Sequence, residues 1–263
     1  MSAFIAATNV AKTYATRTGP VHAVANASFE ASEGQFISLL GPSGCGKSTL
    51  LMMLAGLESP SAGTLTLSGE PVVGPRRDTG IIFQDATLLP WKTVMENVLF
   101  PLQILKLNAH TYRDRAVELI KRVALSGFES KKPHELSGGM RQRVAICRAL
   151  VHDPKVLLMD EPFSALDAIT RDQMNVVLAE MLERYRKTVV FVTHSIREAV
   201  YLSDRVLVMG GRPSSIILDL PIPFERPRRF DIEETPAFIS LCRTLRLTIE
   251  RAHVDSDRAA MRS

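Results

Sequence analysis

Three short, predominantly apolar runs stand out in the hydrophobic pattern of the chain: residues 36–40, 156–159 and 189–192. Each run is followed directly by a glycine or by polar residues. Short continuous apolar runs of this kind are typical of strands that are buried on both faces of a parallel sheet. The pattern therefore predicts an α/β fold with a parallel sheet at its core.

Other stretches predict strands of a different kind. Residues 3–40 contain several short apolar groups with turn residues between them, which predicts short strands separated by turns. Tyr14 lies in a polar stretch of this region that we expect to be a turn. Residues 64–67 and 80–83 predict two further strands, and Gly69 and Pro75 mark turns between them. We therefore expect additional strands beside the parallel core.

Helical spacing dominates two other regions. Residues 85–135 look mostly helical, and within them residues 111–123 place apolar side chains on one helical face. The only tryptophan, Trp91, precedes a helix that we expect from Thr93 onward, and it fits either a buried anchor or an apolar knob on a docking surface. The tail beyond residue 231 also has near-helical apolar spacing, which leaves open whether it packs or frays.

Composition excludes several classes of protein. The 263 residues are 46% hydrophobic, and their net charge of +4 is too small to indicate nucleic-acid binding, although it suits work beside an anionic membrane. Three widely spaced cysteines, Cys45, Cys147 and Cys242, argue against a disulfide framework or a zinc site. No stretch approaches the roughly 18 apolar residues of a membrane span. We expect a soluble protein of a reducing compartment.

A glycine-rich loop follows the first apolar run and leads into a helix. It has the pattern G-x-x-x-x-G-K-[ST] between a predicted strand and a predicted helix, the context of a phosphate-binding loop. Glycines let successive backbone N–H groups converge on phosphate oxygens at the positive end of the helix. We therefore predict a nucleoside triphosphate site whose loop residues are Gly41, Ser43, Gly44, Cys45, Gly46, Lys47, Ser48 and Thr49.

Polar side chains end three of the predicted strands. Gln84 follows one, Asp160 and Glu161 follow another, and His194 follows a third. Ligands of open α/β sheets lie at the carboxyl edge of the strands. Asp160 is suited to hold Mg²⁺ through water, together with the Ser48 hydroxyl, and Glu161 is suited to take the proton of an attacking water.

A second candidate anion site lies at the start of a helix near residue 138. Ser137 stands where an N-cap belongs, and Gly138 and Gly139 expose backbone N–H groups behind it. Taken with the phosphate loop, Gln84, Asp160-Glu161, residues 164–167 and His194, this Leu-Ser-Gly-Gly motif has the order and spacing of the ATP-binding cassette (ABC) ATPases. The chain resembles that family over about residues 3–215.

The resemblance implies a fold and its subdivisions. ABC ATPases combine a RecA-like parallel-sheet core with an antiparallel β subdomain at the N-terminus and a helical subdomain. Carried over to this chain, the ATPase domain spans residues 3–235, with the helical subdomain inserted at about residues 88–150. Residues 236–263 then form a C-terminal helical tail.

The resemblance also implies roles around ATP and Mg²⁺. Tyr14 looks like the aromatic residue that stacks on adenine, and Gln84 is similar to the residue that contacts Mg²⁺ and the attacking water and links the site to a membrane partner. Glu161 matches the general base, and His194 matches the residue that contacts the γ-phosphate.

A head-to-tail pair of chains is implied by the same motifs. Each chain carries one phosphate loop and one Leu-Ser-Gly-Gly signature, so Ser137, Gly138 and Gly139 would close over the ATP that a second copy holds. Asp167 matches a loop that crosses this interface. Met140 stands where the commonest signature has Gln, but the phosphate contacts come from the serine and glycines, so we expect activity to survive.

Two features of the sequence indicate which type of ABC protein this is: the number and length of its cassette motifs, and the resemblance of two segments to one subfamily. One cassette without a long insertion favours the energy-coupling subunit of a membrane importer over a ribosome-acting or chromosome-repair ATPase. Residues 83–91 and 166–174 resemble the nitrate/sulfonate/taurine branch, most of all its taurine ATPases. The alternatives are an importer ATPase for another small nitrogen compound or an aromatic acid, and a soluble ABC ATPase without a role in transport.

The importer interpretation implies partners and a location. They are a transmembrane permease, and through it an extracytoplasmic substrate-binding protein, with no nucleic acid. The chain would be peripheral on the cytoplasmic face of the inner (plasma) membrane.

Overall fold

The computed structural model describes residues 3–211 and 213–260. It separates into two compact units, one made of Met1–Arg76 with Arg186–Ser263 and the other of Arg77–Tyr185. We call them the loop unit and the helical unit.

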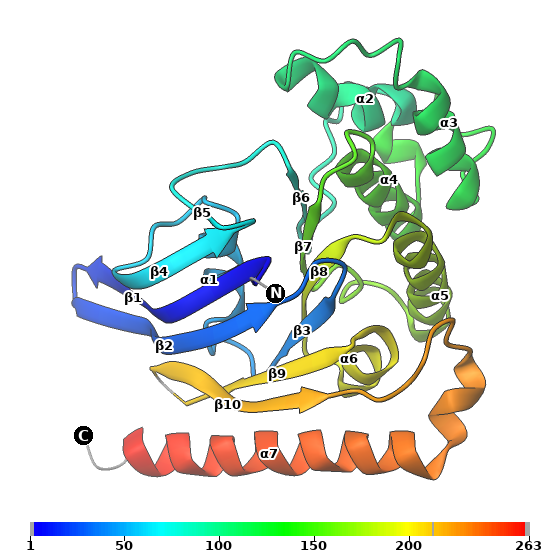
Figure 1. Cartoon of the computed structure of the whole chain (residues 1–263). Helices are drawn as coiled ribbons and strands as arrows, with labels where there is room; N and C mark the ends of the chain where they lie inside the picture. Colours follow the sequence, from blue (N-terminus) through cyan, green and yellow to red (C-terminus); the bar gives the residue numbers. More distant parts are fainter. Residues whose placement is uncertain (1–2, 212, 261–263) are drawn as a thin grey trace. The chain divides into compact units, whose positions relative to one another are not determined.

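The loop unit contains a large mixed sheet (Figure 1). Its strands lie in the order β5-β4-β1-β2-β10-β9-β3-β8, and helices accompany the sheet. The elements of this unit are β1 (Ile5–Thr16), β2 (Gly19–Ala31), β3 (Phe36–Leu40), α1 (Lys47–Leu54), β4 (Ala62–Leu67), β5 (Glu70–Pro71), β8 (Thr188–Thr193), α6 (Ile196–Leu202), β9 (Arg205–Gly210), β10 (Ser214–Pro221), the 3₁₀-helix η2 (Phe230–Glu234) and α7 (Pro236–Ala260).

The predicted core strands of this unit are buried and pair in parallel. β3 lies between β8 and β9 and pairs in parallel with both. Every residue of β3 and β8 is buried, as the continuous apolar runs predicted. β1, β2 and β4 pair antiparallel at the other side of the sheet. The predicted α/β class with a parallel core is therefore confirmed.

Two features of the sheet differ from the sequence-based expectation. Instead of short strands and turns, β1 and β2 form one long hairpin, and Tyr14 lies within β1 rather than in a turn. Shifts in the β1–β2 register between Ala7 and Thr13 break the apolar–polar alternation, which explains why the pattern looks interrupted. The antiparallel pair β9 and β10 was not predicted.

The helical unit combines two parallel strands with four α-helices. β6 pairs in parallel with β7, and α2, α3 and α4 pack on one another (Figure 1). The elements are β6 (Thr79–Ile82), α2 (Val94–Ile104), α3 (Arg113–Arg122), the 3₁₀-helix η1 (Pro133–Glu135), α4 (Gly138–Leu150), β7 (Val156–Asp160) and α5 (Ala168–Tyr185). Residues 85–93 are less helical than predicted, because α2 begins only at Val94, after a Thr93–Glu96 capping box.

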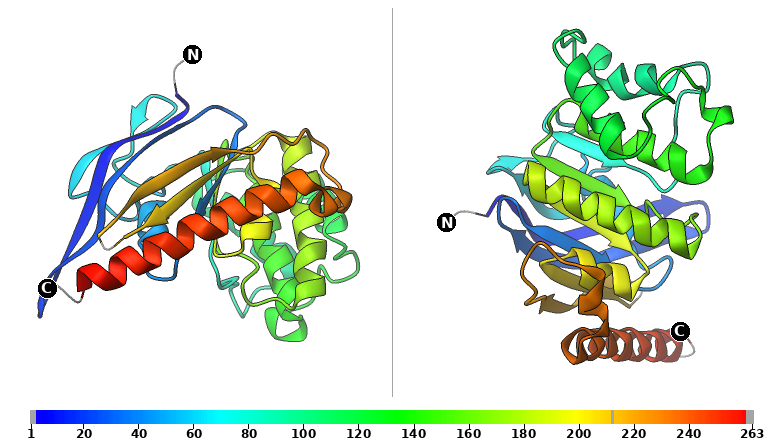
Figure 2. Two further views of the ribbon diagram at one scale, coloured as in Figure 1. Left: turned by 90° about the horizontal axis from the view of Figure 1, so that it is seen from below. Right: turned by 90° about the vertical axis from the view of Figure 1, so that its right-hand side faces the viewer.

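The tail packs on its own unit and does not fray. α7 runs along β9 and β10 in both figures (Figures 1 and 2), and its Phe238 and Leu245 are buried. A Cβ atom on Gly210 of β9 would lie 2.8 Å from that of Ala252, which shows how closely helix and strand approach. Residues 261–263 of the predicted tail lie outside the described residues. Among the described helices, none combines the length and apolar composition needed to cross a bilayer.

Candidate functional site

The phosphate-binding pattern lies where a nucleotide loop belongs, between the carboxyl end of β3 and the start of α1. Lys47 is buried, and its Nζ donates hydrogen bonds to the carbonyl oxygens of Gly41 (2.8 Å) and Pro42 (2.9 Å). The ammonium group therefore lies inside the curl of the loop. Ser43, Gly44 and Ser48 are exposed, so the loop presents polar groups at the N-terminal end of α1.

Close backbone approach explains two of the loop glycines. A Cβ atom on Gly41 would lie 2.3 Å from the carbonyl oxygen of Met209 in β9. Gly46 is the N-cap of α1 with φ +94°, and a Cβ atom there would lie 2.7 Å from the carbonyl oxygen of Ala23. Glycine is the residue that fits both positions, because L-residues rarely adopt such a φ and backbone carbonyls cannot move aside cheaply.

His194 follows the strand next to the one that feeds the loop. Leu40 of β3 pairs with Thr193 of β8, so the loop and His194 leave the sheet at the same edge. The buried Thr193 hydroxyl donates to the Glu198 carboxylate (2.6 Å) and accepts from the Ser195 backbone N–H (2.9 Å). These bonds fix the turn that carries the exposed His194 side chain.

Tyr14 is half-buried on β1 in the same unit. The ammonium of Lys12 lies 4.9 Å from the centre of its ring and also pairs with Glu58 at 2.7 Å. This cation–π contact with Lys12 fixes the orientation of the Tyr14 ring.

In the helical unit, α4 holds the segment that carries Gln84. Gln142 donates through Nε2 to the carbonyl oxygen of Phe83 (3.1 Å). Arg148 donates to the carbonyl oxygens of Ala86 (2.8 Å) and Thr87 (2.9 Å), and burial lowers the pKa of its guanidinium. Gln84 itself is exposed between these anchored residues.

The start of α4 has the predicted cap. The Ser137 hydroxyl accepts a hydrogen bond from the Met140 backbone N–H (3.2 Å), and Ser137 and Gly138 are exposed. Gly139 is buried, and a Cβ atom there would lie 2.9 Å from Cγ2 of Thr170 in α5. The second glycine therefore lets α4 and α5 approach, while the serine and the first glycine face solvent.

Asp160, Glu161 and Asp167 lie along the connection from β7 to α5. Asp160 ends β7 and is buried, with 9% of its surface exposed. Because Ile82 pairs with Met159, the Gln84 segment and the two carboxylates leave the β6–β7 pair at the same edge. Glu161 has φ +43°, a conformation that costs a non-glycine residue energy and is frequent at functional sites.

Asp167 organises the first turn of α5. Its carboxylate accepts a hydrogen bond from the Thr170 backbone N–H (3.0 Å), and this bond lowers the pKa of Asp167. The side chain is exposed, so the carboxylate stays charged at the surface at neutral pH.

Trp91 is not a core residue: 68% of its surface is exposed. The turn that presents it is held by the buried Asn97, whose Oδ1 accepts from the Leu89 N–H (2.8 Å) and whose Nδ2 donates to the carbonyl oxygens of Leu89, Lys92 and Thr93. The structure thus decides between the two interpretations of this tryptophan in favour of an exposed apolar side chain.

Sequence reasoning missed the residues that hold the candidate residues in place. Gln142, Arg148, Asn97 and Glu198 act through bonds to the backbone or to a neighbouring hydroxyl. A polar residue inside a helix that is otherwise apolar on that side was the available signal for Asn97 and Gln142.

Comparison with known proteins identifies the family. A family model described as "ABC transporter" matches residues 24–164, more than half of the chain. The chain belongs to the ABC transporter family. The predicted family, the cassette fold and ATPase activity are therefore confirmed, and ATP is the substrate of this ABC protein.

Relatives and solved structures give more detail. The aliphatic sulfonates import ATP-binding protein of Bacillus cereus is 43% identical over 221 residues, 83% of this chain and 87% of the relative. The taurine import ATP-binding protein of Burkholderia pseudomallei is 43% identical over 222 residues, 84% of this chain and 85% of the relative. A dimeric ATP-binding cassette solved in a post-hydrolysis state with ADP and Pi is 34% identical, with a TM-score of 0.74 over 84% of this chain and 100% of that chain.

Proposed function

We propose that this ABC ATPase is the energy-coupling subunit of a bacterial importer for a small anionic or zwitterionic nutrient such as taurine, an alkanesulfonate or nitrate. Its likeness to ATP-binding proteins for sulfonate and taurine import, over more than four fifths of both chains, carries this proposal. The chain would work at the cytoplasmic face of the inner membrane as a peripheral subunit.

ATP binds, in this proposal, with its phosphates on the loop of residues 41–49. Lys47 is held inside the curl of the loop, from where its ammonium reaches the β- and γ-phosphates. Tyr14 stacks on the adenine ring, and His194 contacts the γ-phosphate. The shared sheet edge of the loop and His194 supports the last assignment.

The donor set fits Mg²⁺. No group of three His, Cys, Asp or Glu side chains able to hold a metal by itself occurs among the described residues. Mg²⁺ needs no such group, because it binds through one or two protein oxygens, water and the phosphates of its substrate. Ser48, Asp160 and Gln84 supply a hydroxyl, a carboxylate and an amide oxygen. Bound Mg²⁺ neutralises charge that develops on the phosphate oxygens.

Hydrolysis in this scheme rests on Glu161. Its carboxylate takes a proton from the attacking water, and Gln84 orients that water through its amide. The anchoring of the Gln84 segment by Gln142 and Arg148 supports a role that demands a fixed position.

Two copies of the chain pair head to tail around ATP. The signature residues Ser137, Gly138 and Gly139 of one copy complete the site on the loop of the other, and Asp167 lies at the same interface. The exposure of Ser137 and Gly138 at a helix N-terminus supports this, as does the dimeric state of the related cassette. We expect Glu161→Gln to bind ATP and accumulate as a dimer, because hydrolysis normally separates the copies.

The permease docks, we propose, on the surface that carries Trp91, and an extracytoplasmic binding protein delivers the nutrient to it. A large exposed aromatic ring in a turn fixed by a buried asparagine suits an interface anchor. We expect Trp91→Ala to keep ATPase activity and to weaken transport, whereas Ile104→Ala, a matched change of an exposed apolar residue on α2, leaves both unchanged.

Uptake of labelled taurine, an alkanesulfonate and nitrate tests the function. Cells without the gene should lose uptake of one compound, and the wild-type gene but not the Glu161→Gln copy should restore it. If all three uptakes persist, the branch is wrong, and other small nitrogen compounds and aromatic acids come next. If no uptake depends on the gene while the purified chain hydrolyses ATP, a non-transport ABC ATPase replaces the importer.

A further inference from the structure

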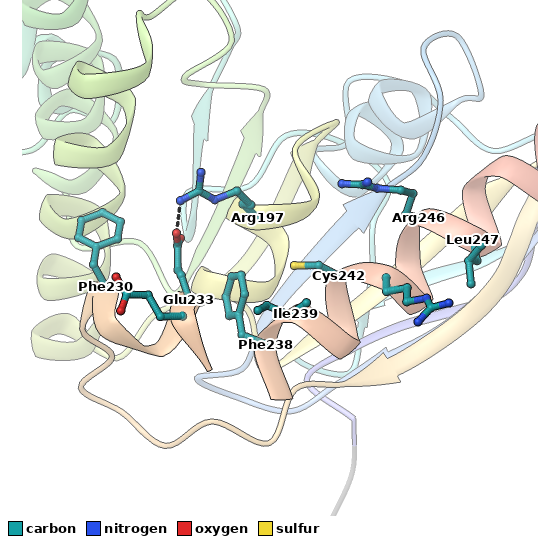
Figure 3. A pocket seen from close by; sticks show the side chains of 10 residues that line it. Arg197, Phe230, Glu233, Phe238, Ile239, Cys242, Arg246 and Leu247 are labelled. Atoms are coloured by element: carbon teal, nitrogen blue, oxygen red, sulfur yellow. Dashed lines mark hydrogen bonds and ion pairs between the residues drawn. The ribbon is translucent and has the colours of Figure 1, made fainter. Parts of the chain in front are cut away.

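A hollow beside α7 contains none of the residues that we assign to ATP hydrolysis. It is lined by side chains of α6, η2 and α7 (Figure 3) and has a volume of about 820 Å³. Pockets that bind small molecules have volumes of about 300–1,000 Å³. The hollow is therefore large enough to take one small ligand.

Its apolar walls are preformed. The ring of Phe230 stacks on Tyr201 with centroids 5.0 Å apart, and the ring of Phe238 stacks on Phe224 at 6.1 Å. Packing of this kind holds the lining rings in place before a ligand arrives, which lowers the entropic cost of binding. Phe238 is buried, whereas Phe230 and Ile239 remain 36% and 58% exposed and offer apolar surface to a ligand.

Three arginines and two glutamates, Glu233 and Glu234, line the hollow, and the excess of one positive charge favours an anion. Arg197 forms an ion pair with Glu233, which the dashed line in Figure 3 marks. Within the part of the chain that the structure describes, Arg243 and Arg246 form no ion pair. Figure 3 shows Arg246 and Cys242 extending from α7 toward the side on which Arg197 lies. Two guanidinium groups thus have unused capacity for an acid.

The spacing along α7 explains why these groups gather. Cys242, Arg243, Arg246 and Leu247 come three, four, seven and eight residues after Ile239, the offsets of one helix face, and all five residues line the hollow. The buried Leu245, and Ala252, whose Cβ atom lies against Gly210 of β9, do not line the hollow. One face of α7 therefore secures the helix, and the neighbouring face is left to bind.

We propose that this hollow binds a small organic anion, a carboxylate or sulfonate with an aromatic or branched aliphatic body. The planar guanidinium groups of Arg243 and Arg246 match the oxygens of such an acid, and its apolar body lies on Phe230 and Ile239.

Chemical labelling of Cys242 measures whether the hollow is occupied by a ligand. Cys45 and Cys147 are buried, whereas Cys242 is partly exposed and lines the hollow. Burial and the nearby Glu233 raise the pKa of the Cys242 thiol, so labelling is best followed at pH 8. We expect saturating naphthalene-2-sulfonate to slow modification of Cys242 by the uncharged reagent N-ethylmaleimide at least about fivefold, measured by mass spectrometry of the full chain.

Calorimetry measures the affinity and its chemical basis. Naphthalene-2-sulfonate should bind once per chain, whereas uncharged 2-naphthalenemethanol and inorganic sulfate should each bind at least about tenfold more weakly. Arg243→Gln and Arg246→Gln should each raise the Kd about tenfold, the usual effect of losing one charge-assisted hydrogen bond. Arg251→Gln, an exposed change on α7 outside the hollow, should leave the Kd unchanged.

Three results would overturn the proposal. They are equal Kd values for the wild type and a folded Arg243→Gln/Arg246→Gln variant, calorimetric binding without protection of Cys242, and protection by phosphatidylglycerol vesicles but not by the soluble sulfonate. The last result would make this face a membrane contact. Thermal unfolding and ATP turnover of each variant show that the fold and the hydrolytic site are intact, so failure here is separable from failure of the proposed function.

Discussion

Arg228 fastens the segment that leads into α7 to the end of α6. Its Nη1 donates to the carbonyl oxygens of Val200 (3.3 Å), Tyr201 (2.9 Å) and Ser203 (2.8 Å), and its Nε and Nη2 donate to that of Phe224 (3.2 and 2.9 Å). A cation at these carbonyls also complements the negative C-terminal end of a helix. We expect Arg228→Met, which keeps the length of the side chain, to destabilise the loop unit.

The size of the effect follows from two opposing terms. Four carbonyl groups lose a charged donor, and each unsatisfied buried acceptor costs about 1 kcal/mol or more. Removing the guanidinium gives back part of this, because burial is unfavourable for the charge: together with Arg226, burial lowers the pKa of Arg228 to about 10. We therefore expect a net loss of about 2–3 kcal/mol in the free energy of unfolding.

Urea unfolding followed by circular dichroism measures this loss. With an m-value of about 3 kcal/mol per molar, the midpoint of Arg228→Met should fall by about 1 M. Arg229→Met is the matched control, because Arg229 is exposed and its change should alter stability by less than about 0.5 kcal/mol. Arg228→Lys should lie between them, since an ammonium keeps the charge but not the planar set of donors. Equal midpoints for the Met variants would refute the reasoning.

Three other predictions address the loop, α4 and α2. Gly46→Ala should weaken ATP binding at least about tenfold by calorimetry, because the added Cβ atom would meet the backbone carbonyl of Ala23. Gly69→Ala is the control: it has the same kind of backbone strain, at φ +79°, but no clash, and it should leave ATP binding unchanged. Arg148→Met should lower the kcat of ATP hydrolysis with little change in KM, since it frees the Gln84 segment; an equal rise in KM would contradict this. A hydrogen bond from the Thr93 backbone N–H lowers the pKa of Glu96, so this cap stabilises α2 fully above about pH 4.5, the ordinary pKa, and is lost as pH falls through the lowered value; NMR titration of Glu96 checks it.

The continuous apolar runs predicted the core strands closely, because a strand buried on both faces has no polar positions to confuse the pattern. β3 and β7 therefore begin and end at, or within one residue of, the predicted positions. The long hairpin of β1 and β2 escaped prediction for the opposite reason. Its register shifts move successive side chains out of strict alternation, and much of its surface is polar and exposed.

Motif residues were predictable and their supports were not. The loop around Lys47 and the cap at Ser137 follow from local sequence, since the helix that begins there dictates the spacing. Gln142 and Arg148 instead bond to a segment about sixty residues earlier in the chain. Contacts between positions so far apart leave no periodic trace in one sequence. The exposure of Trp91 likewise depends on how Asn97 folds the preceding turn.

α4 has two roles. Ser137 is exposed at its N-terminus, and Gln142 and Arg148 hold the Gln84 segment by hydrogen bonds from its middle and its last turn. Because an α-helix turns by about 100° per residue, the directions of these groups are set by their separations in number of residues. Inserting one residue between Ser137 and Gln142 would rotate Ser137 by about 100° around the helix axis relative to Gln142 and Arg148. The separations of five residues from Ser137 to Gln142 and of six residues from Gln142 to Arg148 therefore set the directions in which the three side chains leave α4.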